Sequence, residues 1–401
     1  MPAEDRRQLG RAVIRGVVRA HAQLLSQRGE QLWPLALEHG YASAVEDAIF
    51  GYGRLQPLFE IPEAENIELH GCDSVIVQFG DGRRVEHPPV ADSDAELVEA
   101  IRFLGASATP ARAFDDAHPM MTLALGDRFR LHAIAFGLSY RPAIVIRQHL
   151  LTDVSLRDLA ASGMLPGQLA ELLADCVLAR KSMVISGDQG AGKTTLLRAL
   201  LAAIPDGERI GTLETDYELL THLLPNRRNM VALQAKVGLG EYRQGRSIGE
   251  YTVADLIPEA LRQNLSRLIV GEVRGQEAGA MFEAMQSGTG TMSTTHSHSA
   301  ASTMDRLAAR VAQGGVLTMS EAYRQIALNL HLLIHVKLVD DTWRGGIRRR
   351  FIGEVRELTG AMENGRPVTH LAYLADDSGQ LAEFSPSAGL LAELRMLRGR
   401  R

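Results

Sequence analysis

One stretch constrains the fold of this chain more than any other, residues 182–200, which read SMVISGDQGAGKTTLLRAL. A short apolar run at 183–185 ends in a glycine-rich turn, and a helical pattern of leucines follows it. Between the two lies the spacing G-x-x-x-x-G-K-T, from Gly187 to Thr194. Strand, glycine loop and helix in this order form a phosphate-binding loop, because backbone N–H groups and a helix N-terminus then surround one anion. The sequence therefore predicts nucleotide binding.

The residues of this loop have different expected roles. Lys193 would reach the β- and γ-phosphates, and the Thr194 hydroxyl would be a ligand of Mg²⁺. The glycines let the backbone turn tightly enough to point several N–H groups at the phosphates. The expected nucleotide contacts within the loop are Gly187, Asp188, Gln189, Gly190, Ala191, Gly192, Lys193, Thr194 and Thr195.

Three further strands are predicted to end in polar residues at the same edge of a sheet. An apolar strand at 267–270 leads to Glu272, a strand at 209–213 to Glu214, and a strand at 291–295 to His296. Because ligands bind outside the carboxyl ends of parallel strands, we expect these side chains to face the phosphate loop. One carboxylate would hold the metal and the other would align an attacking water, with Glu272 as the metal ligand, directly or through water. His296 would contact the γ-phosphate.

Other classes of protein fit the sequence less well. His296 and His298 have a spacing that suits a metal, but no cysteine or carboxylate cluster accompanies them. The chain lacks both the guanine-reading N/TKxD stretch of GTPases and the LSGGQ signature of transport ATPases. A formal net charge of −5 argues against nucleic acid as the main partner. A DNA-translocating or recombinase-type motor keeps the same strand order and remains an alternative.

The pattern before and after the loop predicts an α/β protein with two domains. Residues 41–152 show strands with period two at 67–69, 75–77, 83–85, 121–125, 130–135 and 143–147, together with a helix that Asp94 caps and Gly105 closes, which indicates an α+β domain. Strands then alternate with helices over 153–401, which predicts a mostly parallel sheet covered on both faces. The last part returns to strands at 330–339, 348–355 and 369–374, followed by a helix.

Residues 1–40 are predicted to form a helical extension. Apolar Leu9, Val13, Val17 and Leu24 recur at helical spacing, and beside them lies a stripe of Arg7, Arg11, Arg15 and Arg19. We favour a helix that packs by its apolar stripe and exposes the arginines; a basic face for anionic lipid or an acidic partner is the alternative. Two cysteines without CxxC spacing, no run of about 18–20 apolar residues and no signal-peptide pattern predict a cytoplasmic protein, with a position at the membrane surface left open.

Taken together, the motifs resemble those of the secretion-superfamily ATPases, which power type II and type IV secretion and pilus assembly. Four boxes occur in order, and the likeness extends over about residues 51–310, with DRFRLHA (127–133) and IVIRQH (144–149) similar to two arginine-bearing strands of that family. The subgroup that the chain resembles most is that of the CpaF-like tight-adherence (Tad) pilus ATPases. The boxes are GDQGAGKTT (187–195), RIGTLETDYEL (209–219), LIVGEVRGQEA (268–278) and GTGTMSTTHSHS (288–299).

The resemblance implies a RecA-like C-terminal domain behind a smaller α+β N-terminal domain, with ATP and Mg²⁺ bound between them. It implies a homohexamer at the inner face of the cytoplasmic membrane, coupled to platform proteins of a pilus or secretion machine, with no nucleic acid expected. It places catalytic roles on Glu214, Glu272, Arg274 and His296, and it adds Arg130 and Arg147 as nucleotide contacts from the N-terminal domain. From the residues alone, pairing of these two arginines with a carboxylate such as Asp127 is the alternative.

The chain departs from the usual motifs at three positions. Thr215 replaces the second acid of its box, and whether Asp216 takes over is open. His298 stands where asparagine is usual, and Lys236 where arginine is common. Because the other motif residues are present, we expect an active ATPase.

Overall fold

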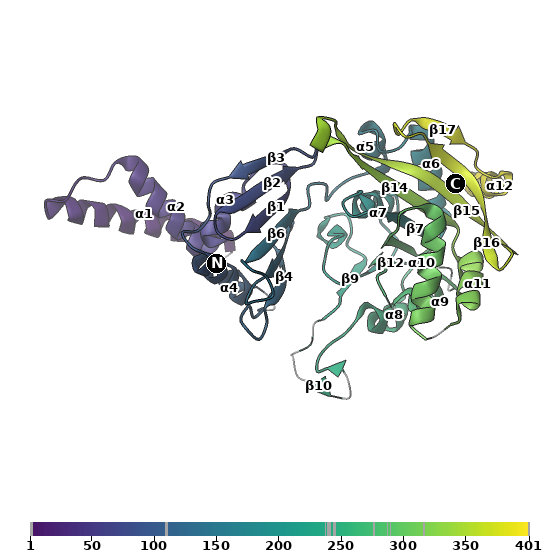
Figure 1. Cartoon of the computed structure of the whole chain (residues 1–401), viewed down its shortest axis with the longest axis horizontal. Helices are drawn as coiled ribbons and strands as arrows, with labels where there is room; N and C mark the ends of the chain where they lie inside the picture. Colours follow the sequence, from purple (N-terminus) through teal and green to yellow (C-terminus); the bar gives the residue numbers. More distant parts are fainter. Residues whose placement is uncertain are drawn as a thin grey trace. The chain divides into compact units, whose positions relative to one another are not determined.

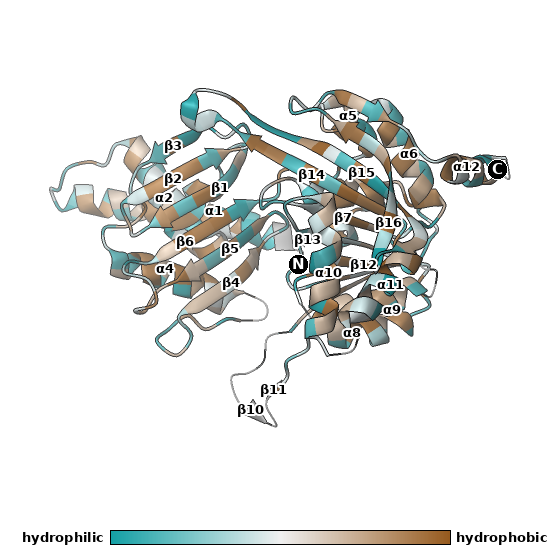
Figure 2. Ribbon diagram, turned by 45° about the vertical axis from the view of Figure 1, so that its right-hand side comes forward, coloured by the Kyte–Doolittle hydropathy of each residue, from teal (hydrophilic) through white to brown (hydrophobic). Residues whose placement is uncertain are grey.

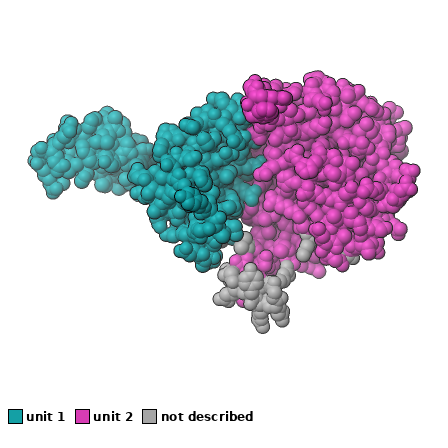
Figure 3. Space-filling view, in the orientation of Figure 1, with its two compact units in different colours: residues 1–150 teal, residues 151–401 magenta. Residues whose placement is uncertain are grey.

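The apolar patterns of the sequence fold into two separate cores in the computed structural model. It describes residues 3–108, 111–236, 238, 242–243, 246–275, 277–286, 288, 290–315 and 317–399. Contacts divide the chain into two compact units, Met1–Leu150 and Leu151–Arg401, which Figure 3 colours teal and magenta. Each unit buries its own hydrophobic clusters. Among the described residues, no helix is both long and apolar enough to cross a bilayer.

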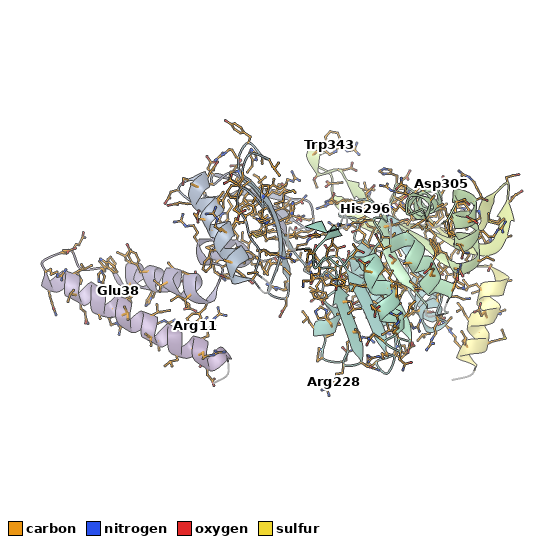
Figure 4. The ribbon with its side chains drawn as sticks, turned by 90° about the horizontal axis from the view of Figure 1, so that it is seen from below. Arg11, Glu38, Arg228, His296, Asp305 and Trp343 are labelled. Atoms are coloured by element: carbon orange, nitrogen blue, oxygen red, sulfur yellow. The ribbon has the colours of Figure 1, made fainter. Side chains whose placement is uncertain are left out.

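Two helices that lie side by side begin the first unit, α1 (Ala3–Gln27) and α2 (Leu35–Phe50) (Figures 1 and 4). The prediction of a helix is confirmed, but the predicted packing face is wrong. The stripe Leu9, Val13, Val17 and Leu24 is exposed, and Ile14 and Ala22 are buried instead.

Small residues and charge pairing explain this orientation of α1. A Cβ on Gly10 would lie only 2.3 Å from the Phe50 ring, so α2 approaches α1 at this glycine. Arg11 pairs with Glu46 of α2. The arginine stripe is therefore divided: Arg11 faces α2, whereas Arg15 and Arg19 are exposed.

The rest of the first unit is a six-stranded antiparallel sheet with one long helix. The strand order is β3-β2-β1-β6-β5-β4. Ser93, not Asp94, caps the long helix by accepting a hydrogen bond from the Glu96 N–H, and Asp94 instead pairs with Arg141; the helix also continues past Gly105. The elements are η1 (Gly53–Leu55), α3 (Gln56–Phe59), β1 (Ala64–His70), β2 (Ser74–Phe79), β3 (Arg84–His87), α4 (Asp94–Ser107), β4 (Met120–Leu125), β5 (Phe129–Ile134) and β6 (Ala143–Gln148).

The second unit is built on a nine-stranded sheet whose strands carry mostly hydrophobic residues, drawn brown in Figure 2. The order is β17-β16-β15-β14-β7-β13-β12-β8-β9, parallel from β14 to β9 and antiparallel from β14 to β17. The strands are β7 (Met183–Gly187), β8 (Ile210–Glu214), β9 (Met230–Gln234), β12 (Arg267–Glu272), β13 (Met292–His296), β14 (Leu332–Asp340), β15 (Arg348–Glu363), β16 (Arg366–Ala375) and β17 (Leu381–Phe384), with a small separate pair β10 (Tyr242–Arg243) and β11 (Arg246–Ser247).

Helices cover both faces of this sheet, as the alternation of strands and helices predicts. One cluster joins the sheet to α5, α6 and α7, and the other joins it to α8, α9, α10 and α11 (Figure 1). Ser155 and Asp158 form a capping box at the start of α5. The helices are α5 (Leu156–Ala161), α6 (Gly167–Leu178), α7 (Lys193–Ala202), η2 (Thr221–Leu223), α8 (Val253–Leu261), α9 (Glu277–Gln286), α10 (Ala300–Gln313), α11 (Met319–Asn329), η3 (Thr342–Arg344) and α12 (Ala388–Arg398).

Candidate active site

The phosphate loop joins the buried strand β7 to α7 and depends on glycine at defined points. Gly190 and Gly192 have φ of 74° and 94°, in the left-handed region that other residues avoid. Gly187 is needed for a different reason, because a Cβ there would lie 2.3 Å from the Val336 carbonyl oxygen of β14. The loop thus has the tight backbone that the motif requires, with α7 beginning at Lys193 directly after it.

Lys193, the first residue of α7, is 7% exposed, and its side chain lies against this loop. Its Nζ donates to the carbonyls of Gly187 and Asp188, at 3.0 and 2.7 Å. The same Nζ lies 3.2 Å from Nδ1 of His296. His296, which Figure 4 labels, ends the neighbouring strand β13. Since an ammonium group only donates, Nδ1 accepts, and the neutral imidazole then carries its proton on Nε2.

That Nε2 faces Glu272, at the end of β12. His296 Nε2 lies 3.0 Å from Glu272 Oε1, and Arg274 Nη2 lies 2.7 Å from Glu272 Oε2. Burial alone would raise the pKa of Glu272, but the contacts with His296 and Arg274 outweigh it and lower the pKa to about 2. Glu272 is therefore ionised at neutral pH, as a metal ligand or an acceptor from water must be.

Glu214 ends β8, the strand next to β12, and has a contrasting environment. Its side chain is 3% exposed, and Oε1 accepts from the N–H groups of Glu218 and Leu219 at 3.0 and 2.8 Å. Oε2 is buried without a hydrogen-bond partner among the residues that the structure describes. Burial raises the pKa of Glu214 to about 7, although the two N–H bonds oppose it. Of the two neighbouring carboxylates, one is thus strongly acidic and the other titrates near neutrality.

The structure also places the residues at which the motifs depart from their usual form. His298 Nδ1 lies 3.0 Å from Oδ1 of Asp188, so this histidine contacts the phosphate loop. Thr215 is exposed. Asp216 and Glu218 both raise the pKa of Arg274, after the larger effect of Glu272, so acidic charge does surround this arginine. Within the described ranges, no group of three histidine, cysteine or carboxylate side chains could hold a metal by itself.

Two arginines close to the site were missed in the sequence. Arg350 of β15 donates from Nε to the Gly190 carbonyl of the phosphate loop, at 2.7 Å. Arg310 of α10 donates to the Val273 carbonyl and, at 2.6 Å, to the Thr295 hydroxyl, and so braces the ends of β12 and β13. Arg350 belongs to a run of three arginines, but nothing in such a run indicates a neighbour 160 residues earlier.

The two arginines expected from the first unit lie on adjacent strands. Arg130 of β5 and Arg147 of β6 are directly opposite each other in the antiparallel register, and both are half-buried. The antiparallel register therefore brings the two expected arginines to one place on the sheet.

The sequence comparisons identify the family of this chain. Residues 73–361 match the model of a protein family described as "Type II/IV secretion system protein". The chain belongs to this family. A putative conjugal transfer protein of Mycobacterium tuberculosis (strain H37Rv) is 32% identical over 333 residues, which cover 81% of this chain and 89% of the relative. VirB11 of Agrobacterium fabrum (strain C58) is 34% identical over 131 residues, which cover 32% of this chain and 35% of VirB11.

Solved structures of similar proteins show the same fold as this type II/IV secretion system protein. The Legionella pneumophila ATPase DotB has a TM-score of 0.51 at 22% identity, over 73% of this chain and 77% of DotB. The pilus retraction motor PilT, solved with bound ADP, has a TM-score of 0.50 at 16% identity, over 86% of each chain. The mixed α/β architecture, in which a RecA-like domain follows a smaller N-terminal domain along the chain, is therefore as predicted. The resemblance to secretion ATPases is confirmed at the level of the family, and the tight-adherence subgroup remains a prediction.

Proposed function

We propose that this chain is an ATP-hydrolysing motor of a type II/IV secretion or pilus-assembly machine. The observation that carries the proposal is the continuous series of contacts from Lys193 in the phosphate loop, through His296, to Glu272 and Arg274. This series connects the group that would hold the phosphates to an ionised carboxylate. Membership of the secretion family supports the same reading.

The residues present fit a nucleotide with Mg²⁺. The loop has the left-handed glycine backbone that a phosphate cradle needs, at Gly190 and Gly192, and the Oε2 atom of Glu214 is buried with no partner among the described residues. Lys193 and the loop N–H groups would bind the phosphates, and Thr194 and Glu272 would hold Mg²⁺, Glu272 directly or through water. When bound, the metal ion supplies charge that stabilises the phosphoryl group in the transition state.

The remaining groups would orient and activate water. Glu214, when ionised, would accept a hydrogen bond from the attacking water and hold it in line with the γ-phosphate. His296 would sense the γ-phosphate through its position between Lys193 and Glu272. Arg274 would keep Glu272 ionised and fix the orientation of its carboxylate.

In the same proposal, the first unit supplies charge from outside the phosphate loop. Arg130 and Arg147 would contact the nucleotide, so that ATP draws the two domains together and hydrolysis releases them. A homohexamer working in this way at the inner face of the cytoplasmic membrane would drive platform proteins of a pilus, of which the tight-adherence type is the first candidate, or of a protein secretion system. The second candidate is a DNA-translocating motor, and one relative carries the name of a conjugal transfer protein.

The proposal is tested by ATP turnover in the full chain, with and without Mg²⁺. Lys193→Ala should lose nucleotide affinity, whereas Glu272→Gln should still bind ATP but turn over about 100-fold or more slowly, because it removes an ionised group at the reacting phosphate. Glu259→Gln is the matched control, since its carboxylate pairs with Arg262 at the exposed surface of α8. Wild-type turnover by Glu272→Gln would contradict the proposal. Strong stimulation by DNA would favour the second candidate.

A further inference from the structure

Arg198 is a buried arginine that the proposed mechanism does not use. It lies on α7, the helix that follows the phosphate loop, and is 4% exposed. Burying a guanidinium group is costly unless acceptors surround its donors. Three backbone carbonyls from two other segments accept from it: Nε donates to Leu219 at 3.0 Å, Nη1 to Leu151 at 2.7 Å, and Nη2 to Glu218.

The segment that contains Glu218 and Leu219 also binds the carboxylate of Glu214. The peptide group between Glu218 and Leu219 is bound at both ends: its N–H, from Leu219, donates to Glu214 Oε1 at 2.8 Å, and its carbonyl, from Glu218, accepts from Arg198. A carboxylate and a guanidinium thus share one buried peptide group, and each polarises it in the sense that strengthens the other bond. The next residue, Leu220, has a φ of 55°, which a leucine adopts only when its surroundings hold it there.

The second segment is the start of the second unit. Leu151, whose carbonyl accepts from Nη1, is the first residue of that unit, directly after the point at which contacts divide the chain. One side chain on the phosphate-loop helix therefore connects the segment that leads into this unit with the backbone that orients Glu214.

We propose that Arg198 is a positioning residue that couples the segment at Leu151 to Glu214. Movement of that segment would shift the guanidinium, which would shift the shared peptide group and with it the carboxylate of Glu214. The inference rests on the proposed role of Glu214 in hydrolysis. It adds a route by which displacement of the chain between the two units changes the rate of the chemical step.

Arg227 offers a matched control. It is also buried, at 6% exposure, and it donates to the backbone carbonyls of Leu201 and Ala202 at the C-terminal end of α7. Loss of its guanidinium would remove bonds to the same helix, but those bonds end at Leu201 and Ala202 and not at the peptide group of Glu218 and Leu219. A general loss of stability would therefore affect both variants, whereas the proposed coupling affects only Arg198.

The experiment compares Arg198→Lys and Arg227→Lys in the full chain, each with and without Glu214→Gln. Lysine keeps the charge, but its single nitrogen replaces three nitrogens that are spread over the guanidinium plane and that each serve one carbonyl. Arg198→Lys should lower kcat about tenfold with the KM for ATP within about twofold, because a small displacement of a catalytic group is enough for such a loss. Arg227→Lys should leave kcat within about twofold. In the Glu214→Gln background, Arg198→Lys should lower kcat further by less than about twofold, because the carboxylate that Arg198 positions is no longer present.

Other outcomes overturn the inference. If the tenfold loss persists in the Glu214→Gln background, or if Arg227→Lys gives the same loss, Arg198 is only structural. If Glu214→Gln itself has wild-type turnover, the proposed role of Glu214 in hydrolysis is wrong. This result is distinct from the outcomes above, which contradict only the positioning role of Arg198. If Arg198→Lys does not fold, the coupling is tested instead by amide hydrogen exchange in the Glu214→Gln variant, compared with the wild type. Exchange should then rise both at the Glu218 and Leu219 amides and around Leu151, and unchanged exchange around Leu151 refutes the coupling.

Discussion

The contrasting acidities of the two site carboxylates lead to a prediction about stability. Glu214 is 3% exposed, and burial raises its pKa to about 7 from 4.5 in the unfolded chain. Well below pH 4.5 the carboxyl group is protonated in the folded and in the unfolded chain, so it does not lower the free energy of unfolding. As the pH rises from there through 7, the unfolded chain ionises first, and the folded chain loses stability. We therefore expect Glu214→Gln, which resembles the protonated form in shape, to stabilise the protein at high pH.

The magnitude follows from the two pKa values. A carboxyl group with a pKa of about 7 in the folded chain and 4.5 in the unfolded chain costs about 3 kcal/mol at pH 8 and less than about 1 kcal/mol at pH 5. The free energy of unfolding of Glu214→Gln minus that of the wild type should thus grow by about 2.5 kcal/mol between pH 5 and pH 8. Other titrating groups cancel in this difference because both proteins contain them.

Urea unfolding followed by circular dichroism measures the difference directly. Glu259→Gln serves as the control, because an exposed carboxylate in a surface pair should give a difference that changes little with pH. The reasoning is refuted if the difference for Glu214→Gln is flat between pH 5 and pH 8. It is equally refuted if the wild type is the more stable protein at pH 8, since the ionised carboxylate would then be well compensated.

Three further predictions concern nucleotide binding and turnover. Because burial raises the pKa of Glu214 to about 7, ATP turnover should increase as the pH rises through 7, and a flat rate from pH 6 to pH 8 would count against a role for the ionised form. Arg350→Ala removes one hydrogen bond to the Gly190 carbonyl and should weaken ADP binding about fivefold by calorimetry; unchanged affinity would show that this bond does not shape the loop. The double variant Arg130→Ala/Arg147→Ala should keep ADP binding but lose about tenfold or more in turnover, and normal turnover would leave the first unit without a part in hydrolysis.

Much of the fold was predictable because its signals are local. The strand, loop and helix around Lys193 are contiguous in the chain, and glycines at fixed spacing leave few other backbone paths. Alternation of apolar strands with helices predicts the parallel sheet. Since the carboxyl ends of parallel strands share one edge, it also predicts that Glu214, Glu272 and His296 come close to the loop. These predictions depend on neighbours in sequence and on one general property of sheets.

Errors and omissions occur where a second element decides the outcome. Periodicity identified α1 but not its buried side, because that side depends on Glu46 and Phe50 of α2. The residue that caps α4 is Ser93 and not the predicted Asp94, because Arg141, which lies far along the chain, binds the aspartate. Each correction involves a contact partner that the local pattern does not contain.

The sequence by itself therefore determined which chemistry this chain carries: a phosphate loop, two carboxylates and a histidine at the ends of neighbouring strands. Only the tertiary structure decided how those groups differ. Glu272 is acidic because Arg274 and His296 contact it, and Glu214 titrates near neutrality because burial dominates its two N–H bonds. The physical reason is that a pKa depends on solvent exclusion and on charges within a few ångströms, and both are set by packing between segments that are distant in the chain.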